Sequence, residues 1–216
     1  MKQENCLRVR MLGGFSMEYA NRPISFGKRT QSRFIQLFQL LMLHQEGVGK
    51  DQLIEALYGW EDIGNKNICL NNLVYRLRKQ LASVGLPQDE YVKVSSGICV
   101  WNGTIPVDSD VQKFEYEYDA ALHTEDPDRQ VSHLMCAWNT YTGELLPQLA
   151  SENWVIEESE RLKKLYCGCV NRLGQLLKSR REYQQMLEVY KTAADLYPFE
   201  EYRGGGTGQP CIAGTL

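Results

Sequence analysis

The chain lacks several features that would place it in a common functional class. It has no run of the roughly 18 apolar residues that a bilayer-spanning helix needs, so we expect no contact with a membrane. Its start, MKQENCLRVR, has no apolar secretion-signal segment, which predicts a cytoplasmic protein with reduced thiols. The net charge is small, −3 over 216 residues, so overall charge alone points to no class of partner.

Residues that commonly carry catalysis or hold metals are also scarce. The three histidines, His44, His123 and His133, stand apart, and none has an HxxxH, HExxH or nucleophile-elbow context. The seven cysteines are scattered except for Cys167 and Cys169, whose i, i+2 spacing on a helix directs them to different faces. We therefore predict no enzymatic activity, no metal site and no cofactor.

The charges that are present divide unequally along the chain. Residues 1–105 carry 13 Lys and Arg against 9 Asp and Glu, whereas residues 106–216 carry 11 against 18. Such asymmetry is typical of a chain in which one domain contacts phosphates and the other does not. We predict a DNA-binding domain at 1–105 that folds alone, a truncated helical domain at 106–202, and a glycine-rich linker or non-native tail at 203–216.

The first domain is predicted to be an α+β winged helix-turn-helix on a small antiparallel sheet. Alternating apolar residues predict three strands before the first helix, and a tight hairpin follows the third helix. The predicted strands are 7–11, 15–19 and 24–26, the helices 30–45, 51–58 and 67–81, and the hairpin strands 91–94 and 98–101.

The segment 67–81, NICLNNLVYRLRKQL, is the strongest functional signal. Leu70, Val74, Leu77 and Leu81 recur at helical spacing, and the residues between them are polar or cationic, with no acid. A cationic helix beside a hairpin is how winged helices meet DNA, with the helix in the major groove. The predicted DNA-binding residues are Asn71, Asn72, Tyr75, Arg76, Lys79, Lys28, Arg29, Lys93, Ser95 and Ser96.

Each residue on this helix also has a structural interpretation. The amides of Asn71 and Asn72 can pair with adenine, or they can be solvated or capping groups. Tyr75 suits a thymine methyl group, a phosphate, or packing against the preceding helix. Arg76 and Lys79 share one face and suit phosphates or guanine.

The remaining cations have alternatives too. Arg78 points away from Arg76 and is expected to be structural, pairing with Glu55 or Asp51. The cations around the start of the first long helix form either a phosphate clamp or a solvated charge run; they are Lys28, Arg29 and Arg33.

The second domain is predicted to be all-α and similar to a tetratricopeptide repeat. Its expected helices are 110–122, 129–141, 154–178 and 182–197. A 34-residue frame counted from residue 167 places small and apolar residues where paired helices approach and a proline where the second helix ends. The matching residues are Leu173, Gly174, Tyr190, Ala193 and Pro198.

These stretches support a family resemblance over about residues 7–200. LRVRMLGGFSMEYANRPISF, QLFQLLMLHQEGVGKDQLIEALYGW and LNNLVYRLRKQL resemble the OmpR/PhoB-class winged-helix domain, closest to the Streptomyces antibiotic regulatory protein type. PVDSDVQKFEYEYDAAL and CAWNTYTGELLPQL are similar to the bacterial transcriptional activator domain that accompanies it. One departure lies in the wing, where an aromatic residue and Arg usually follow the glycine but this chain has Ile98 and Cys99.

The resemblance implies a sequence-specific transcriptional regulator, an activator that binds direct repeats in double-stranded DNA. It implies a homodimer on DNA and contact with RNA polymerase through the helical domain. The alternative is a helical protein-binding adaptor whose first domain has little affinity for DNA. The two differ in salt-dependent binding to duplex DNA.

Overall fold

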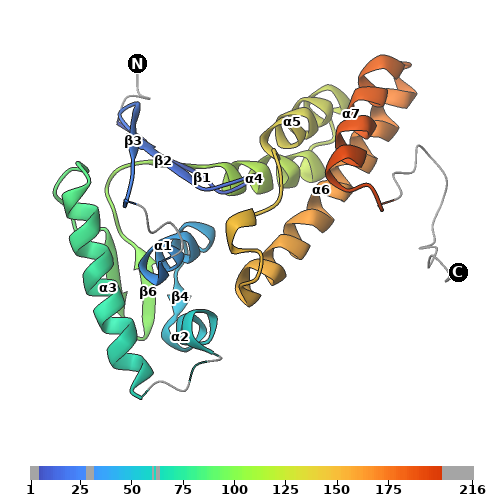
Figure 1. Ribbon diagram of the computed structural model, residues 1–216. Coiled ribbons are helices and arrows are strands. Elements are labelled where there is room, and N and C mark those ends of the chain that lie inside the picture. Colours follow the sequence, from blue (N-terminus) through green and yellow to red (C-terminus); the bar gives the residue numbers. More distant parts are fainter. Residues whose placement is uncertain (1–4, 28–31, 60, 62–63, 201–216) are drawn as a thin grey trace, which may run out of the picture. The chain divides into compact units, whose positions relative to one another are not determined.

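The computed structural model describes residues 5–27, 32–59, 61 and 64–200. The chain packs as two compact units, each built from two separate stretches (Figure 1). Unit 1 is Met1–Phe114 with Thr140–Leu162, and unit 2 is Glu115–Asn139 with Lys163–Leu216. The predicted boundary at 105 falls inside unit 1, so the units divide the chain differently from the predicted domains. The predicted tail at 203–216 lies outside the described residues.

The N-terminal sheet of unit 1 has four strands in the order β3-β2-β1-β7. β1 (Leu7–Arg10), β2 (Ser16–Tyr19) and β3 (Arg22–Ile24) are antiparallel, as predicted, although β3 begins and ends two residues before the predicted strand. In β1 the inward residues Leu7 and Val9 are fully buried, which follows the period-2 pattern of the sequence.

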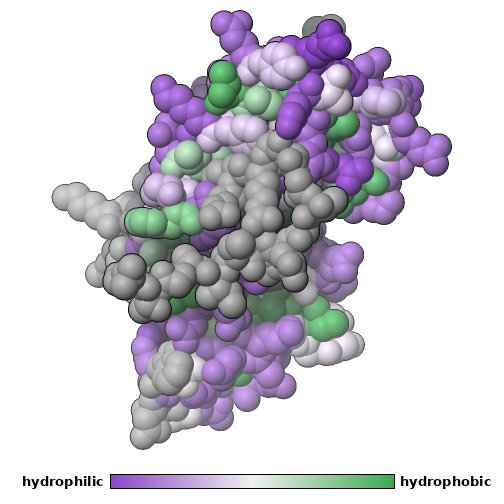
Figure 2. Space-filling model, turned by 90° about the vertical axis from the view of Figure 1, so that its right-hand side faces the viewer, coloured by the Kyte–Doolittle hydropathy of each residue, from purple (hydrophilic) through white to green (hydrophobic). Residues whose placement is uncertain are grey.

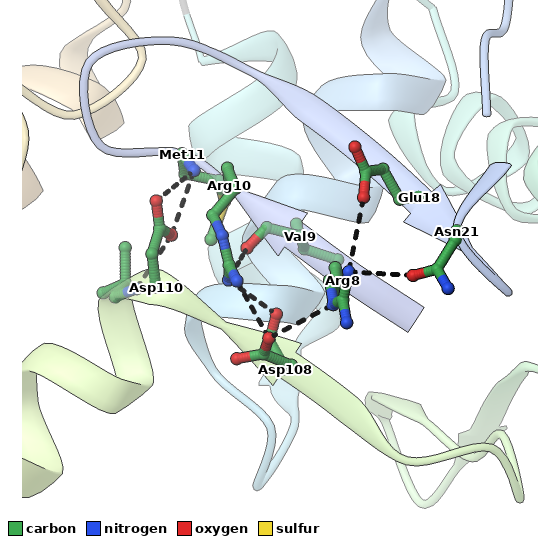
Figure 3. Close-up of polar contacts among 9 residues, drawn as sticks. Arg8, Val9, Arg10, Met11, Glu18, Asn21, Asp108 and Asp110 are labelled. Atoms are coloured by element: carbon green, nitrogen blue, oxygen red, sulfur yellow. Dashed lines mark hydrogen bonds and ion pairs between the residues drawn. The ribbon is translucent and has the colours of Figure 1, made fainter. Parts of the chain in front are cut away.

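The fourth strand corrects the sequence prediction. β7 (Val107–Ser109) pairs in parallel with β1, where an extended connector was expected, so the sheet is mixed rather than antiparallel. Two ion pairs to Asp108 support the pairing, at 2.8 Å from Arg10 and 3.9 Å from Arg8 (Figure 3). The strand was missed because a parallel pair joins distant segments and leaves no local turn signal.

Asp110 connects the end of this sheet to the helix that follows. Its carboxylate accepts hydrogen bonds from the backbone N–H of Met11 at 2.9 Å (Figure 3). It also accepts from the N–H of Leu12 at 2.9 Å and of Val111 at 2.8 Å. The residue is only 4% exposed, so these backbone donors have little access to water. One side chain therefore satisfies the end of β1 and the start of α4 (Asp110–His123).

Three helices and a second sheet complete the winged helix. α1 (Arg33–Leu43) is buried almost all round, and α2 (Lys50–Tyr58) and α3 (Lys66–Ser83) pack against it. β4 (Val48–Gly49), β5 (Val92–Ser95) and β6 (Ile98–Trp101) form an antiparallel sheet in the order β4-β6-β5. The predicted winged helix-turn-helix is confirmed, with helix ends shifted by at most three residues.

Residues 140–162 return to unit 1 and pack on its core. The N–H of Gly13 donates to the carbonyl oxygen of Glu144 at 2.8 Å. The N–H of Leu146 donates to the carbonyl oxygen of Met11 at 2.8 Å. The indole of Trp154 donates to the side-chain oxygen of the buried Gln36 in α1 at 3.3 Å. This stretch contains a short 3-10 helix, η1 (Pro147–Leu149), and the first turns of α6 (Asn153–Ser179).

Unit 2 is helical, as predicted, and contains most of α4, α5 (Pro127–Thr140), the later part of α6, and α7 (Tyr183–Leu196). Leu173 and Ala193 are fully buried, and a Cβ at Gly174 would overlap the hydroxyl of Tyr190. The small residue thus lets α6 approach the α7 tyrosine, which agrees with the repeat-like pattern of the sequence.

Among the residues that Figure 2 colours by hydropathy, most are hydrophilic, and the apolar side chains occur in small groups. Within the described part of the chain, no helix combines the length and apolar character required to cross a bilayer.

Candidate nucleic-acid interface

α3 is an amphipathic helix with a defined start. Leu70, Leu77 and Leu81 lie on its buried side with at most 1% exposure. The side chain of Asn65 accepts a hydrogen bond from the N–H of Ile68 at 3.2 Å, which is an N-cap for the first turn. The helix is thereby held by its apolar side, and its opposite side is left to solvent.

The predicted α3 residues gather on that solvent side. Asn71, Asn72, Tyr75, Arg76 and Lys79 are all exposed. No acidic residue occurs anywhere in the helix, so no neighbour on α3 neutralises its cations. Spacings of three and four residues place these side chains within one surface two turns long. The predicted Lys28 and Arg29 lie outside the described residues.

Neighbouring aromatic rings contact two of the cations in this region. The guanidinium of Arg76 lies over the ring of Phe34 at 5.8 Å, within the range of a cation–π contact. That of Arg33 stacks on Tyr58 at 4.7 Å and forms an ion pair with Glu61. Arg33 is therefore a structural cation, whereas Arg76 keeps an exposed charge whose position α1 helps to hold.

Arg78 is structural, as expected, but its predicted partners are wrong. It donates from Nε to the carbonyl of Val92 at 2.9 Å and pairs with Glu90 at 3.3 Å. It does not pair with Glu55 or Asp51, because its side chain extends toward β5 rather than toward α2. Arg78 therefore joins α3 to the first strand of the hairpin and sets the position of the hairpin relative to the helix.

The hairpin ends in a tight two-residue turn. Ser95 pairs with Ile98, and both residues between them have positive φ, 50° at Ser96 and 79° at Gly97. Two positive φ values are characteristic of a type I′ turn, which matches the twist of the flanking strands. The predicted residues Lys93, Ser95 and Ser96 are exposed on this hairpin.

The base of the hairpin is fixed by polar and buried groups. Asp89 accepts hydrogen bonds from the N–H of Thr104 at 2.6 Å and from its hydroxyl at 2.8 Å, and these bonds lower the pKa of Asp89. On β6, burial raises the pKa of Cys99 to about 11, so its thiol stays protonated at neutral pH. Gly47, with φ 103°, lies against Ile98, where an added Cβ would be 2.6 Å from Cγ2.

Sequence reasoning missed one exposed residue of this surface. Ile68 is 56% exposed on α3, four residues before Asn72 and seven before Tyr75. It was overlooked because an isoleucine in a helical pattern is usually assigned to the core. The sequence did contain a signal for its exposure, because Ile68 falls outside the helical spacing of the buried residues that begin at Leu70.

Comparisons with known proteins agree with this architecture. Residues 108–203 match the family described as the bacterial transcriptional activator domain. No curated protein sequence matches the chain. Among solved structures, the fold is similar to "Mycobacterium tuberculosis EmbR in complex with low affinity phosphopeptide", with a TM-score of 0.72 and 17% sequence identity. The match covers 89% of this chain and 51% of that chain, so this chain spans about half the length of its structural relative.

The fold and the domain match together define the class of protein. A winged helix-turn-helix is followed by a bacterial transcriptional activator domain, which is the architecture of a transcriptional regulator. The order of the two domains is the one that the sequence resemblance to the Streptomyces antibiotic regulatory protein type implies, and the structural match supports the fold.

Proposed function

We propose that this chain is a cytoplasmic transcriptional activator that binds double-stranded DNA through the winged helix, with α3 in the major groove. The observation that carries this proposal is the solvent side of α3, where exposed amides and cations occur together without an acid. Asparagine amides match the donor and acceptor pair of adenine, and cations beside them can contact phosphates. Lys93, Ser95 and Ser96 would contact the adjacent backbone from the hairpin.

The direct test is the salt dependence of binding to duplex DNA. Each phosphate contact releases counterions, so log affinity falls with log salt concentration in proportion to the number of contacts. We expect the double variant Arg76→Ala/Lys79→Ala to bind all duplexes more weakly and to flatten the slope by about one unit for each lost contact. Asn71→Ala should instead weaken preference at particular base pairs, by about 1–3 kcal/mol.

A matched control separates α3 from general charge effects. Lys191 is an exposed cation on α7 in unit 2, so Lys191→Ala removes a positive charge without changing α3. It should leave the salt slope unchanged. Equal slopes for the wild type and the Arg76/Lys79 variant, with both folded, would remove α3 from the interface. Absence of salt-dependent binding in the wild type would favour the protein-binding adaptor instead.

The helical module is proposed to hold two copies on DNA and to contact RNA polymerase. A single winged helix covers a short half-site, and specific sites are commonly two half-sites about one turn, or 10–10.5 base pairs, apart. We expect cooperative binding to two direct repeats at that spacing. Inserting five base pairs would place the repeats on opposite faces of the duplex and abolish cooperativity. Unchanged cooperativity would exclude contact between the bound copies.

A further inference from the structure

The solvent side of α3 carries two large side chains with apolar surface among its polar residues. Ile68 is 56% exposed and Tyr75 is 66% exposed. Neither belongs to the buried seam of the helix, and leaving such area in water is unfavourable by about 25 cal/mol for each Å². A partner that covers this side of α3 would therefore need apolar groups at these two positions.

The two side chains are placed as a spaced pair. They are seven residues apart, so they lie on nearly the same line along the helix. Seven residues correspond to a rise of about 10.5 Å, and base pairs of duplex DNA are stacked about 3.4 Å apart. The separation therefore corresponds to about three base-pair steps. Asn71 and Asn72 lie between the two.

The chemistry of the surrounding surface selects a nucleic-acid partner over an apolar protein surface. The exposed residues nearest to the pair are amides and cations, including Arg76 and Lys79, and α3 has no acid. In the major groove, the only apolar group on a base edge is the 5-methyl group of thymine. The adenine paired with it presents the N7 acceptor and the N6 amino donor, which an asparagine amide can bind. One A·T pair can thus satisfy both kinds of side chain.

We propose, on the basis of the function proposed above, that Ile68 and Tyr75 read the 5-methyl groups of two thymines about three base pairs apart. The preferred half-site then contains thymine at both positions, and Asn71 or Asn72 pairs with an adenine between or opposite them. Ile68 supplies its aliphatic side chain and Tyr75 the face of its ring. The hydroxyl of Tyr75 has no part in this contact.

The test deletes the methyl groups from the DNA. A duplex is first selected from a random pool by binding to the full chain, and it is then synthesised with deoxyuridine in place of thymidine at one position at a time. Deoxyuridine retains the pairing edge and loses only the methyl group. Burial of one methyl group predicts roughly fourfold weaker binding for each of two positions and no change at the others.

Protein variants assign each position to its side chain. Ile68→Ala should bind the thymidine duplex roughly fourfold more weakly and lose discrimination against deoxyuridine at one position only. Tyr75→Ala should lose it at the second position, whereas Tyr75→Phe keeps the ring and should keep the discrimination. Leu122→Ala, which trims a 42%-exposed leucine of α4, is the matched control and should change neither affinity nor discrimination.

The outcomes separate this inference from the proposed function. Equal affinity for thymidine and deoxyuridine duplexes, with salt-dependent binding intact, would overturn the methyl contact and leave DNA binding standing. Ile68→Ala that binds DNA as well as the wild type but weakens association between copies would overturn it in favour of a protein contact. No duplex binding at all would overturn both.

Discussion

Replacing Asp110 by alanine should destabilise unit 1 more than any substitution at an exposed acid. The carboxylate is the acceptor for three backbone donors, those of Met11, Leu12 and Val111. A buried donor that loses its acceptor costs about 1–3 kcal/mol. Water can reach some of these groups once the side chain is shortened, so we expect a loss of about 3–5 kcal/mol, the lower part of the range for three such donors.

Equilibrium unfolding in urea measures this loss, with the slope of the transition checked for each variant. Asp110→Asn keeps one acceptor oxygen and should fall between the wild type and Asp110→Ala. Asp108→Ala is the matched control, because it removes an acid two residues away whose side chain is 36% exposed and which pairs with Arg10 and Arg8. An exposed pair contributes about 0–1 kcal/mol. If Asp110→Ala and Asp108→Ala lost equal free energy, the three-donor account of Asp110 would be wrong.

Three further outcomes are expected. Alkylation of the native chain at pH 8, followed by mass spectrometry, should modify the half-buried Cys69 before Cys99, because burial raises the pKa of Cys99 to about 11. Gly174→Ala should lower the free energy of unfolding by about 1–3 kcal/mol through overpacking, and adding Tyr190→Ala, which removes the overlapped ring, should restore part of the loss. Hydrogen bonds lower the folded-state pKa of Asp89 below its ordinary 3.8, so its stabilising contribution is present above pH 3.8 and is lost as the pH falls through the folded pKa; Asp89→Asn should remove this dependence from urea titrations at low pH.

The helices and the hairpin could be predicted because their signals are local. The seam from Leu70 to Leu81 and the Ser96–Gly97 turn each depend on neighbours within a few residues. The parallel partner of β1 could not be predicted, since β7 lies about a hundred residues away and its pairing is visible only in the fold. The return of residues 140–162 to unit 1 is hidden for the same reason, although the helix that begins in this stretch, predicted from residue 154, was correctly recognised.

The sequence predicted which residues of α3 lie on the exposed side, but it did not predict which residues Arg78 contacts. The absence of acids in α3 identified its exposed polar side, and the structure places all five predicted residues of that helix there. The partners of Arg78 could not be chosen from spacing, because a long side chain reaches either the preceding helix or the following strand. Ile68 was missed because apolar residues in a helix are assigned to the core by default. The DNA contacts themselves stay predictions.

The division of each unit into two separate stretches bears on how the chain is made. Segment 140–162 is synthesised after segment 115–139, yet it packs with the N-terminal unit. A ribosome-bound nascent chain therefore cannot complete the N-terminal unit when the hairpin emerges, but only after the beginning of α6 has left the exit tunnel. Until then Gln36 lacks its hydrogen bond from the Trp154 indole, and the backbone of Met11 and Gly13 lacks its partners in segment 140–162. A domain that stays incomplete during synthesis is prone to misassembly. We therefore expect a graft of the winged helix cut near residue 105 to be less stable than one that also carries residues 140–162.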